Sequence, residues 1–223
     1  MTEAQPPSAA PMGQLDIGGL VKKAWALLSA DFALFIVSYL IAAVLASIPL
    51  VGIIIGGPLW FGFLRIIQKR YKGEPAQIGD VFQGFQDFSK GLITILLLVA
   101  LAIVAVIPVV IVVLILAFIP LLGPVLAFIL YLVFLLAVVT CTYFVLSIAA
   151  LSNVQPFDAI KQSITFGLKN FGQMILLGLV TGIVGMIGVV ACGVGVLLTM
   201  PLAMTMVVIA YNEYYLPKAG QAA

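Results

Sequence analysis

Three long stretches without any charged residue dominate the hydrophobic pattern of the chain. They cover residues 32–64, 91–157 and 170–212. A membrane-spanning helix needs about 20 consecutive apolar residues, so each stretch is too long for a single pass. Clusters of Pro and Gly, which mark turns, interrupt each stretch near its middle, at residues 47–52, 118–124 and 192–195. The pattern therefore predicts three helical hairpins, or six transmembrane helices.

The first hairpin is the shortest of the three. Two passes do not fit comfortably into residues 32–64, so its helices are expected to extend into flanking polar positions. Arg65 is the first such position, and its long side chain can carry its charge toward the membrane surface.

An amphipathic stretch precedes each hairpin. In residues 16–32, 79–90 and 156–170, apolar side chains recur at the spacing of one helix face. Each stretch has an aspartate near its start, which favours the exposed amides of a helix N-terminus. The predicted apolar faces include Leu20, Ala24, Trp25 and Leu28 in the first stretch, Val81, Phe82, Phe85 and Phe88 in the second, and Phe157, Ile160, Ile164 and Leu168 in the third.

The same order, an amphipathic helix followed by a hairpin, therefore occurs in residues 16–72, 79–151 and 156–216. Aligning residues 51–71 with residues 194–214 supports the equivalence of the first and third units. Identical residues occur at Val51/Val194, Gly52/Gly195, Pro58/Pro201, Leu59/Leu202, Ile66/Ile209 and Tyr71/Tyr214. Since each unit has an even number of spans, the repeats keep the same orientation and are parallel.

These observations predict an all-α, polytopic membrane protein with one six-span domain over residues 15–216. Residues 1–14 are expected to form a disordered N-terminal tail, and residues 217–223 a C-terminal tail. Hydrophobic residues make up 64% of the chain and charged residues 8%, which excludes an ordinary soluble domain.

The distribution of charge predicts the orientation. With six spans, all ten Lys and Arg residues fall on the side that holds both termini. The positive-inside rule then places both termini in the cytoplasm, for a protein of a prokaryotic inner membrane. The net charge of +2 gives no indication of a nucleic-acid partner.

No enzyme motif is recognisable, histidine is absent, and no cofactor or metal is expected. An enzyme would need a polar pocket at the cytoplasmic interface, near Glu74, Asp80 and Asp87. The densest polar group inside an apolar stretch is residues 140–143 (Thr-Cys-Thr-Tyr). Its hydroxyls either bond back to their own helix or line a wet cavity, and the sequence leaves both open.

Two stripes are candidate binding features. Arg65, Lys69 and Lys72 recur at helical spacing where the second span leaves the membrane. They are either topology charges or a site for anionic lipid headgroups. Four small residues, Gly178, Gly182, Gly185 and Gly188, permit close helix approach, either within the monomer or in a homo-oligomer.

Three short motifs carry a resemblance to a known family. They are Gly62-Phe63-Leu64-Arg65, followed by Lys72-Gly73-Glu74-Pro75; Asp80-Val81-Phe82-Gln83-Gly84-Phe85; and Pro156-Phe157-Asp158-Ala159-Ile160-Lys161-Gln162-Ser163. Their order and spacing resemble a group of poorly characterised prokaryotic six-helix membrane proteins, which includes the membrane domain joined to some glycerophosphodiester phosphodiesterases. This chain has no room for the phosphodiesterase domain. The resemblance implies an inner-membrane protein that acts with lipids or partner proteins.

The sequence thus favours a non-enzymatic membrane scaffold, associated with anionic lipids or with another membrane protein. The alternative is a transporter or channel for a small or hydrophobic solute. A core filled with apolar side chains would favour the scaffold, and a continuous polar cavity would favour the transporter.

Overall fold

The computed structural model describes residues 16–116, 118–119, 122–190 and 195–220, and all regular structure in these ranges is helical. The predicted all-α class is therefore confirmed for this part of the chain. The elements are α1 (Ile17–Ala30), α2 (Phe32–Ala46), α3 (Val51–Tyr71), the 3-10 helix η1 (Ile78–Asp87), α4 (Phe88–Leu116), α5 (Leu122–Thr142), α6 (Val145–Leu151), α7 (Pro156–Lys169), α8 (Phe171–Val190), α9 (Val196–Ala210), the π-helical turn η2 (Tyr211–Tyr215) and α10 (Leu216–Gly220).

The structure bears on only one of the two predicted tails. The predicted N-terminal tail lies outside the described residues. At the other end, α10 continues the helix from Leu216 to Gly220, beyond the predicted end of the membrane domain at residue 216.

The three hairpin connections lie where the Pro and Gly clusters predict them: between α2 and α3, between α4 and α5, and between α8 and α9. Residues 192–194 of the third cluster are outside the described part. In the first connection, Leu50 adopts φ +63°, in the left-handed region that costs a residue with a Cβ about 1–2 kcal/mol. The tight turn thus contains local backbone strain.

The structure supports several membrane-spanning helices but does not fix their number at six. Within the described residues, five helices are long and apolar enough to cross a membrane, and a sixth span requires that α1 and α2 be counted together. Helix α2 alone has 15 residues, or about 22 Å, against a hydrocarbon core of about 30 Å. Helix α1 does not extend it in a straight line, because the pair is bent by 92°. The expected extension occurs only in α3, which continues past Arg65 to Tyr71.

The amphipathic stretches form α1, η1 and α7, each directly before a hairpin. Asp16 caps α1 by accepting from the Gly19 amide at 3.0 Å, and Asp80 closes a capping box at the start of η1. Only part of the predicted apolar face of α7 packs inside the monomer: Ile160 is buried, but Phe157 and Leu168 are exposed. Trp25 on α1 is likewise 48% exposed. In a membrane protein an apolar face can turn to lipid as well as to the core, so periodicity alone does not identify the packed side.

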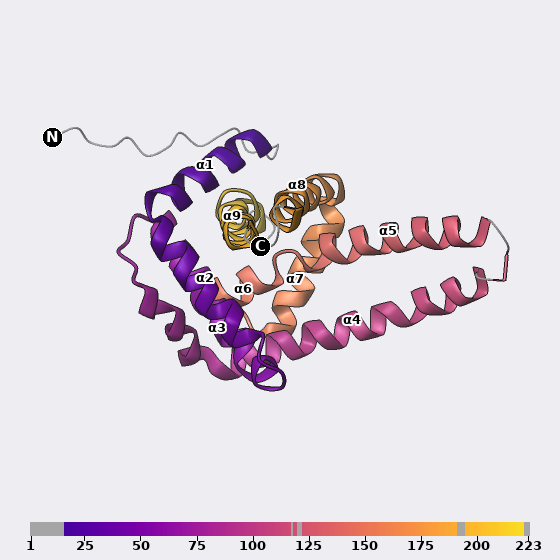
Figure 1. The fold of residues 1–223 in the computed structure, drawn as a ribbon, viewed down its shortest axis with the longest axis horizontal. Helices are drawn as coiled ribbons and strands as arrows, with labels where there is room; N and C mark the ends of the chain where they lie inside the picture. Colours follow the sequence, from indigo (N-terminus) through magenta and orange to yellow (C-terminus); the bar gives the residue numbers. More distant parts are fainter. Residues whose placement is uncertain (1–15, 117, 120–121, 191–194, 221–223) are drawn as a thin grey trace.

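The hairpins are arranged unequally (Figure 1). Helices α4 and α5 extend together away from the remaining helices as a long arm, whereas α8 and α9 are seen nearly end-on in the same view. No residue in the apolar window of α4 is buried in the monomer, whereas half of those in the window of α9 are. The order of elements matches the predicted units, but the middle hairpin runs in a different direction from the third.

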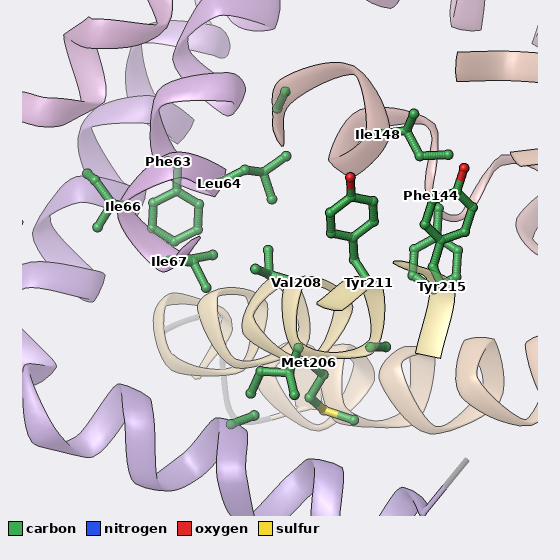
Figure 2. Close-up of a cluster of buried hydrophobic side chains, with 14 of the residues drawn as sticks. Phe63, Leu64, Ile66, Ile67, Phe144, Ile148, Met206, Val208, Tyr211 and Tyr215 are labelled. Carbon is green, nitrogen blue, oxygen red and sulfur yellow. The ribbon is translucent and has the colours of Figure 1, made fainter. Parts of the chain in front are cut away.

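The core is centred on α3 and α9 and also includes buried side chains of α1, α2 and α6 (Figure 2). Ile67 of α3 lies beside Val208 of α9, and the Tyr211 side chain of η2 points toward α6; all three side chains are buried. Positions matched in the repeat alignment play similar roles, since Ile66 in α3 and Ile209 in α9 are both buried. Pro58 and Pro201 also lie inside these two helices.

A glycine seam holds η1 and the start of α4 against α3. A Cβ on Gly62 would lie 1.8 Å from the carbonyl oxygen of Val81, and one on Gly84 would lie 1.8 Å from that of Pro58. Gly57 and Gly91 make the corresponding backbone approach between α3 and α4. The backbones touch directly, so the seam sets the position of every side chain that η1 presents to α3.

Candidate functional site

The C-terminal half of α3 contacts η1 through charged and amide side chains. Arg65 forms an ion pair with Asp87 and donates to the carbonyl oxygen of Gln83 at 3.3 Å. One turn further on, the Lys69 ammonium lies 3.0 Å from Asp80 Oδ2 and 3.0 Å from Gln83 Oε1. Because the two bases are four residues apart, they share one face of α3, and carboxylates of η1 neutralise both.

Bases of this charged cluster also donate hydrogen bonds to the C-terminal end of α6. Arg65 Nε donates to the carbonyl oxygen of Ala150 at 3.3 Å, and Lys90 Nζ donates to that of Ser152 at 2.6 Å. The last carbonyls of a helix have no partner within it and carry partial negative charge, so two cations are suited to this position. The cluster thus joins α3, η1, α4 and α6.

Further polar contacts connect the end of α3 with α1, α2 and η2. Arg70 forms an ion pair with Asp31 at the α1–α2 bend. The side chains of the η2 turn contact α1, α3 and the C-terminal half of α7, and a π-helical turn changes their angular spacing. Its contacts are Asn212 with Gln68, Glu213 with Lys23 and Tyr71, Tyr214 with Asn170, and Tyr215 with Gln162.

A polar pocket of about 220 Å³ opens beside this cluster. Its lining residues are Arg65, Gln68, Lys69, Lys72, Glu74, Ala150 and Leu151. The side chains of Lys72 and Glu74 are exposed and form no hydrogen bond or ion pair with any described residue. The pocket therefore combines a wall of paired charges with one free base and one free acid.

The three predicted headgroup-binding residues thus have unequal roles. Arg65 does not extend outward, as the sequence suggested, but is occupied by Asp87 and by carbonyl oxygens of η1 and α6. Lys69 is occupied by η1. Lys72 alone keeps a side chain without a partner among the described residues. All three line the pocket, and whether lipid binds there stays a prediction.

The predicted glycine stripe divides between neighbours of α8. Gly188 packs against α9, where a Cβ would lie 2.0 Å from Thr199 Oγ1, and Gly185 lies near Met200. Gly178 faces Val139 of α5. Gly182 has open space beside it. Three of the four positions therefore have contacts inside the monomer, and self-association through the stripe stays a prediction.

The polar group at residues 140–143 bonds mainly to helix backbone. The hydroxyls of Thr140 and Thr142 donate to carbonyls four residues earlier in α5, at 2.7 Å each. The Tyr143 hydroxyl crosses to Thr181 of α8 at 2.8 Å. A separate groove of about 460 Å³ runs along α4 and has entirely apolar lining residues. Neither this groove nor the polar pocket includes residues 140–143.

An all-helical chain with several long, exposed apolar helices is compatible with a polytopic helical membrane protein. No protein-family model, curated protein or solved structure matches the chain. The resemblance carried by the three short motifs therefore stays a prediction.

Sequence reasoning missed the partners of the bases on α3. Asp87 and Gln83 were not singled out as partners of Arg65, nor Lys90 as a ligand of the α6 carbonyls. The signal was present in part, because Asp80, Gln83 and Asp87 recur along one short amphipathic stretch. The polar pocket does lie beside Glu74, where an enzyme would need one, but Asp80 and Asp87 do not line it.

Proposed function

We propose that the protein is a non-enzymatic integral protein of a prokaryotic inner membrane that serves as a lipid-associated scaffold. Both termini and the charged ends of the helices face the cytoplasm in this proposal. The related proposal is that the chain belongs with the six-helix membrane proteins that its motifs resemble.

One observation carries the proposal: apolar side chains fill the space between the helices, and charge gathers at one end. The buried cluster centred on α3 and α9 consists of aromatic, aliphatic, alanine and methionine side chains. Four ion pairs among the described residues join separate segments at the polar end: Lys23–Glu213, Arg65–Asp87, Lys69–Asp80 and Arg70–Asp31. Ion pairs that hold the cytoplasmic ends of the helices together, and an interior filled by apolar side chains, suit a scaffold better than a protein that passes solutes.

Association with anionic lipid is supported by the charges that remain unpaired. Among the described residues, Lys22, Lys161 and Lys169 are exposed bases without an ion-pair partner, in addition to Lys72. Lys161 lies 4.5 Å above the exposed ring of Phe157, so α7 presents a cation and an aromatic ring together. Such a surface suits the headgroup region, where each base contributes about 1 kcal/mol of attraction to anionic lipid.

The test is lipid retention measured by native mass spectrometry after gentle extraction. We expect the triple variant Lys22→Gln, Lys161→Gln, Lys169→Gln to retain less anionic lipid than the parent protein. The triple Lys→Arg variant at the same positions keeps the charge and serves as the matched control. Equal retention of anionic lipid by the Gln and Arg triples would contradict the proposal.

The transporter alternative is tested on the same preparation. Reconstituted vesicles should show no protein-dependent solute flux if the protein is a scaffold. Saturable uptake of a small solute that depends on the protein would replace the scaffold with the transporter.

A further inference from the structure

The polar pocket beside α3 is nearly balanced in charge, which argues against a plain anion site. Arg65 and Lys69 bring two positive charges to its wall, but Asp87 and Asp80 already neutralise them from behind. An incoming phosphate would have to compete with these carboxylates for the same donors. Breaking the Lys69–Asp80 pair would leave the mostly buried Asp80 carboxylate uncompensated, and Arg65 is already held by two carbonyl oxygens besides Asp87. The two bases therefore contribute little net attraction for an anion.

The two groups left free in the pocket have opposite charges. Lys72 and Glu74 are two residues apart in the chain segment that follows α3, on either side of Gly73. Gly73 has φ +76°, so the chain turns sharply between them. Two hydrogen bonds hold this segment against the end of α3. The Glu74 amide donates to the Lys69 carbonyl at 2.8 Å, and Arg70 donates to the Glu74 carbonyl at 3.3 Å. A base and an acid are thereby held at the mouth of one pocket.

We propose that this pocket binds a zwitterionic group in which a phosphate and a primary ammonium are joined by a short linker, as in phosphoethanolamine. The Lys72 ammonium binds the phosphate, and the Glu74 carboxylate accepts from the ligand ammonium. A primary ammonium has three donors, whereas the quaternary ammonium of a choline group has none, so the pocket selects ethanolamine over choline. A volume of about 220 Å³ is below that of pockets for drug-sized ligands and suits a headgroup.

Two sources supply this chemistry: the headgroup of phosphatidylethanolamine in the membrane, and a free phosphoethanolamine in solution. The pocket lies at the end of α3, an apolar helix long enough to span a membrane, and Ala150 and Leu151 form an apolar part of its lining. For the lipid source, this inference rests on the proposed lipid association and specifies which headgroup occupies one site.

The experiment uses the full-length protein in nanodiscs of phosphatidylcholine that contain equal fractions of phosphatidylethanolamine and phosphatidylglycerol. Lipids retained after transfer to detergent are counted by native mass spectrometry. We expect about fivefold enrichment of phosphatidylethanolamine over phosphatidylcholine at one tightly retained position. Glu74→Gln should abolish this preference, and Lys72→Gln should weaken retention of the phospholipid at that position.

A charge-exchanged double variant, Lys72→Glu with Glu74→Lys, separates recognition of the pair from a general loss of charge. It keeps the net charge and both functional groups, so it should regain the ethanolamine preference that Glu74→Gln loses and the retention that Lys72→Gln weakens. Asp158→Asn removes an exposed carboxylate outside the pocket; it is the control and should leave this position unchanged. Unchanged selectivity in Glu74→Gln, or preference for phosphatidylglycerol at this one position in the parent protein, would overturn the inference.

The source of the ligand is decided with delipidated protein in detergent. Stabilisation by soluble O-phosphoethanolamine that requires both Lys72 and Glu74 assigns the site to the free compound, and retention of phosphatidylethanolamine alone assigns it to the lipid. The proposed lipid association and the proposed headgroup pocket can fail independently. Loss of anionic lipid in the Lys22, Lys161 and Lys169 triple with no effect of Glu74→Gln refutes only the pocket.

Discussion

Replacement of Gly84 by alanine tests the central packing contact of the fold. The Cβ of an alanine at this position would lie 1.8 Å from the Pro58 carbonyl oxygen and 2.7 Å from the Gly62 amide nitrogen. Cβ contacts shorter than 3.0 Å essentially do not occur, so η1 and α3 would have to separate by about 1.2 Å. Both nearest atoms belong to backbone and have no rotamer by which to move aside.

The separation would also disturb the polar cluster. Gln83, next to Gly84, accepts from Arg65 through its carbonyl and from Lys69 through its side chain, at 3.3 and 3.0 Å. A shift of about 1.2 Å would stretch both bonds past useful length. Overpacking of a tight interface costs about 1–3 kcal/mol, and loss of two hydrogen bonds to charged groups adds to it. We therefore expect Gly84→Ala to lower the free energy of unfolding by about 3 kcal/mol.

Gly79→Ala is the matched control, because Gly79 lies in the same 3-10 helix with nothing within 4 Å of its Cβ position. Unfolding in mixed micelles, followed by far-ultraviolet circular dichroism, measures the difference between the two variants. Gly79→Ala should stay within about 0.5 kcal/mol of the parent protein. If Gly84→Ala is equally neutral, η1 does not pack on α3 by direct backbone contact, and the reasoning fails.

Three further predictions concern charge, strain and topology. Lys69→Met should lower the free energy of unfolding by about 1–3 kcal/mol, because it removes the ion-pair partner of Asp80, whose side chain is 15% exposed. Lys23→Met removes one member of a surface pair with 46% and 35% exposure, and in the same unfolding assay it should lower the free energy of unfolding by less than about 1 kcal/mol. Leu50→Gly should raise stability by about 1 kcal/mol, since glycine adopts φ +63° without strain; a loss of stability would contradict this. A cysteine at Phe118, which is 88% exposed, should react with an impermeant thiol reagent from outside the cell, and one at Pro75 only after permeabilisation; the opposite labelling would reverse the topology.

The positions of the helices were predictable from the sequence, because they depend on local signals. Pro and Gly clusters interrupt long apolar stretches, and each hairpin connection falls within one of them. Aspartates near the start of the amphipathic stretches likewise act locally, as Asp16 does by accepting from the Gly19 amide. These features depend on neighbours a few residues away, and the sequence displays them directly.

The partners of the polar side chains were not predictable in the same way. Arg70 and Asp31 are 39 positions apart, and Lys23 and Glu213 are 190 apart. Such pairs depend on which helices pack together, and an apolar helix in a membrane has no polar face to indicate its packed side. For the same reason the sequence does not say whether the apolar stripe that includes Trp25 faces lipid or protein, and Trp25 is 48% exposed in the monomer.

The three short motifs that resemble a known family form one connected assembly in space. The first two meet at the glycine seam, where Gly62 touches the Val81 backbone, and at Arg65, which donates to Gln83. Arg65 also donates to Ala150 at the end of α6. The third motif supports the start of α6.

That support comes from Ser163 of α7. Its hydroxyl accepts from the Phe144 amide at 3.3 Å and donates to the Cys141 carbonyl at 2.8 Å, across the break between α5 and α6. Gly167, one turn later, lies against the Thr140 carbonyl. The motifs are therefore coupled through contacts at both ends of α6: a substitution in one changes the geometry that the others require. A chain that keeps the glycines and the arginine should for this reason also keep a small hydroxyl residue at the position of Ser163.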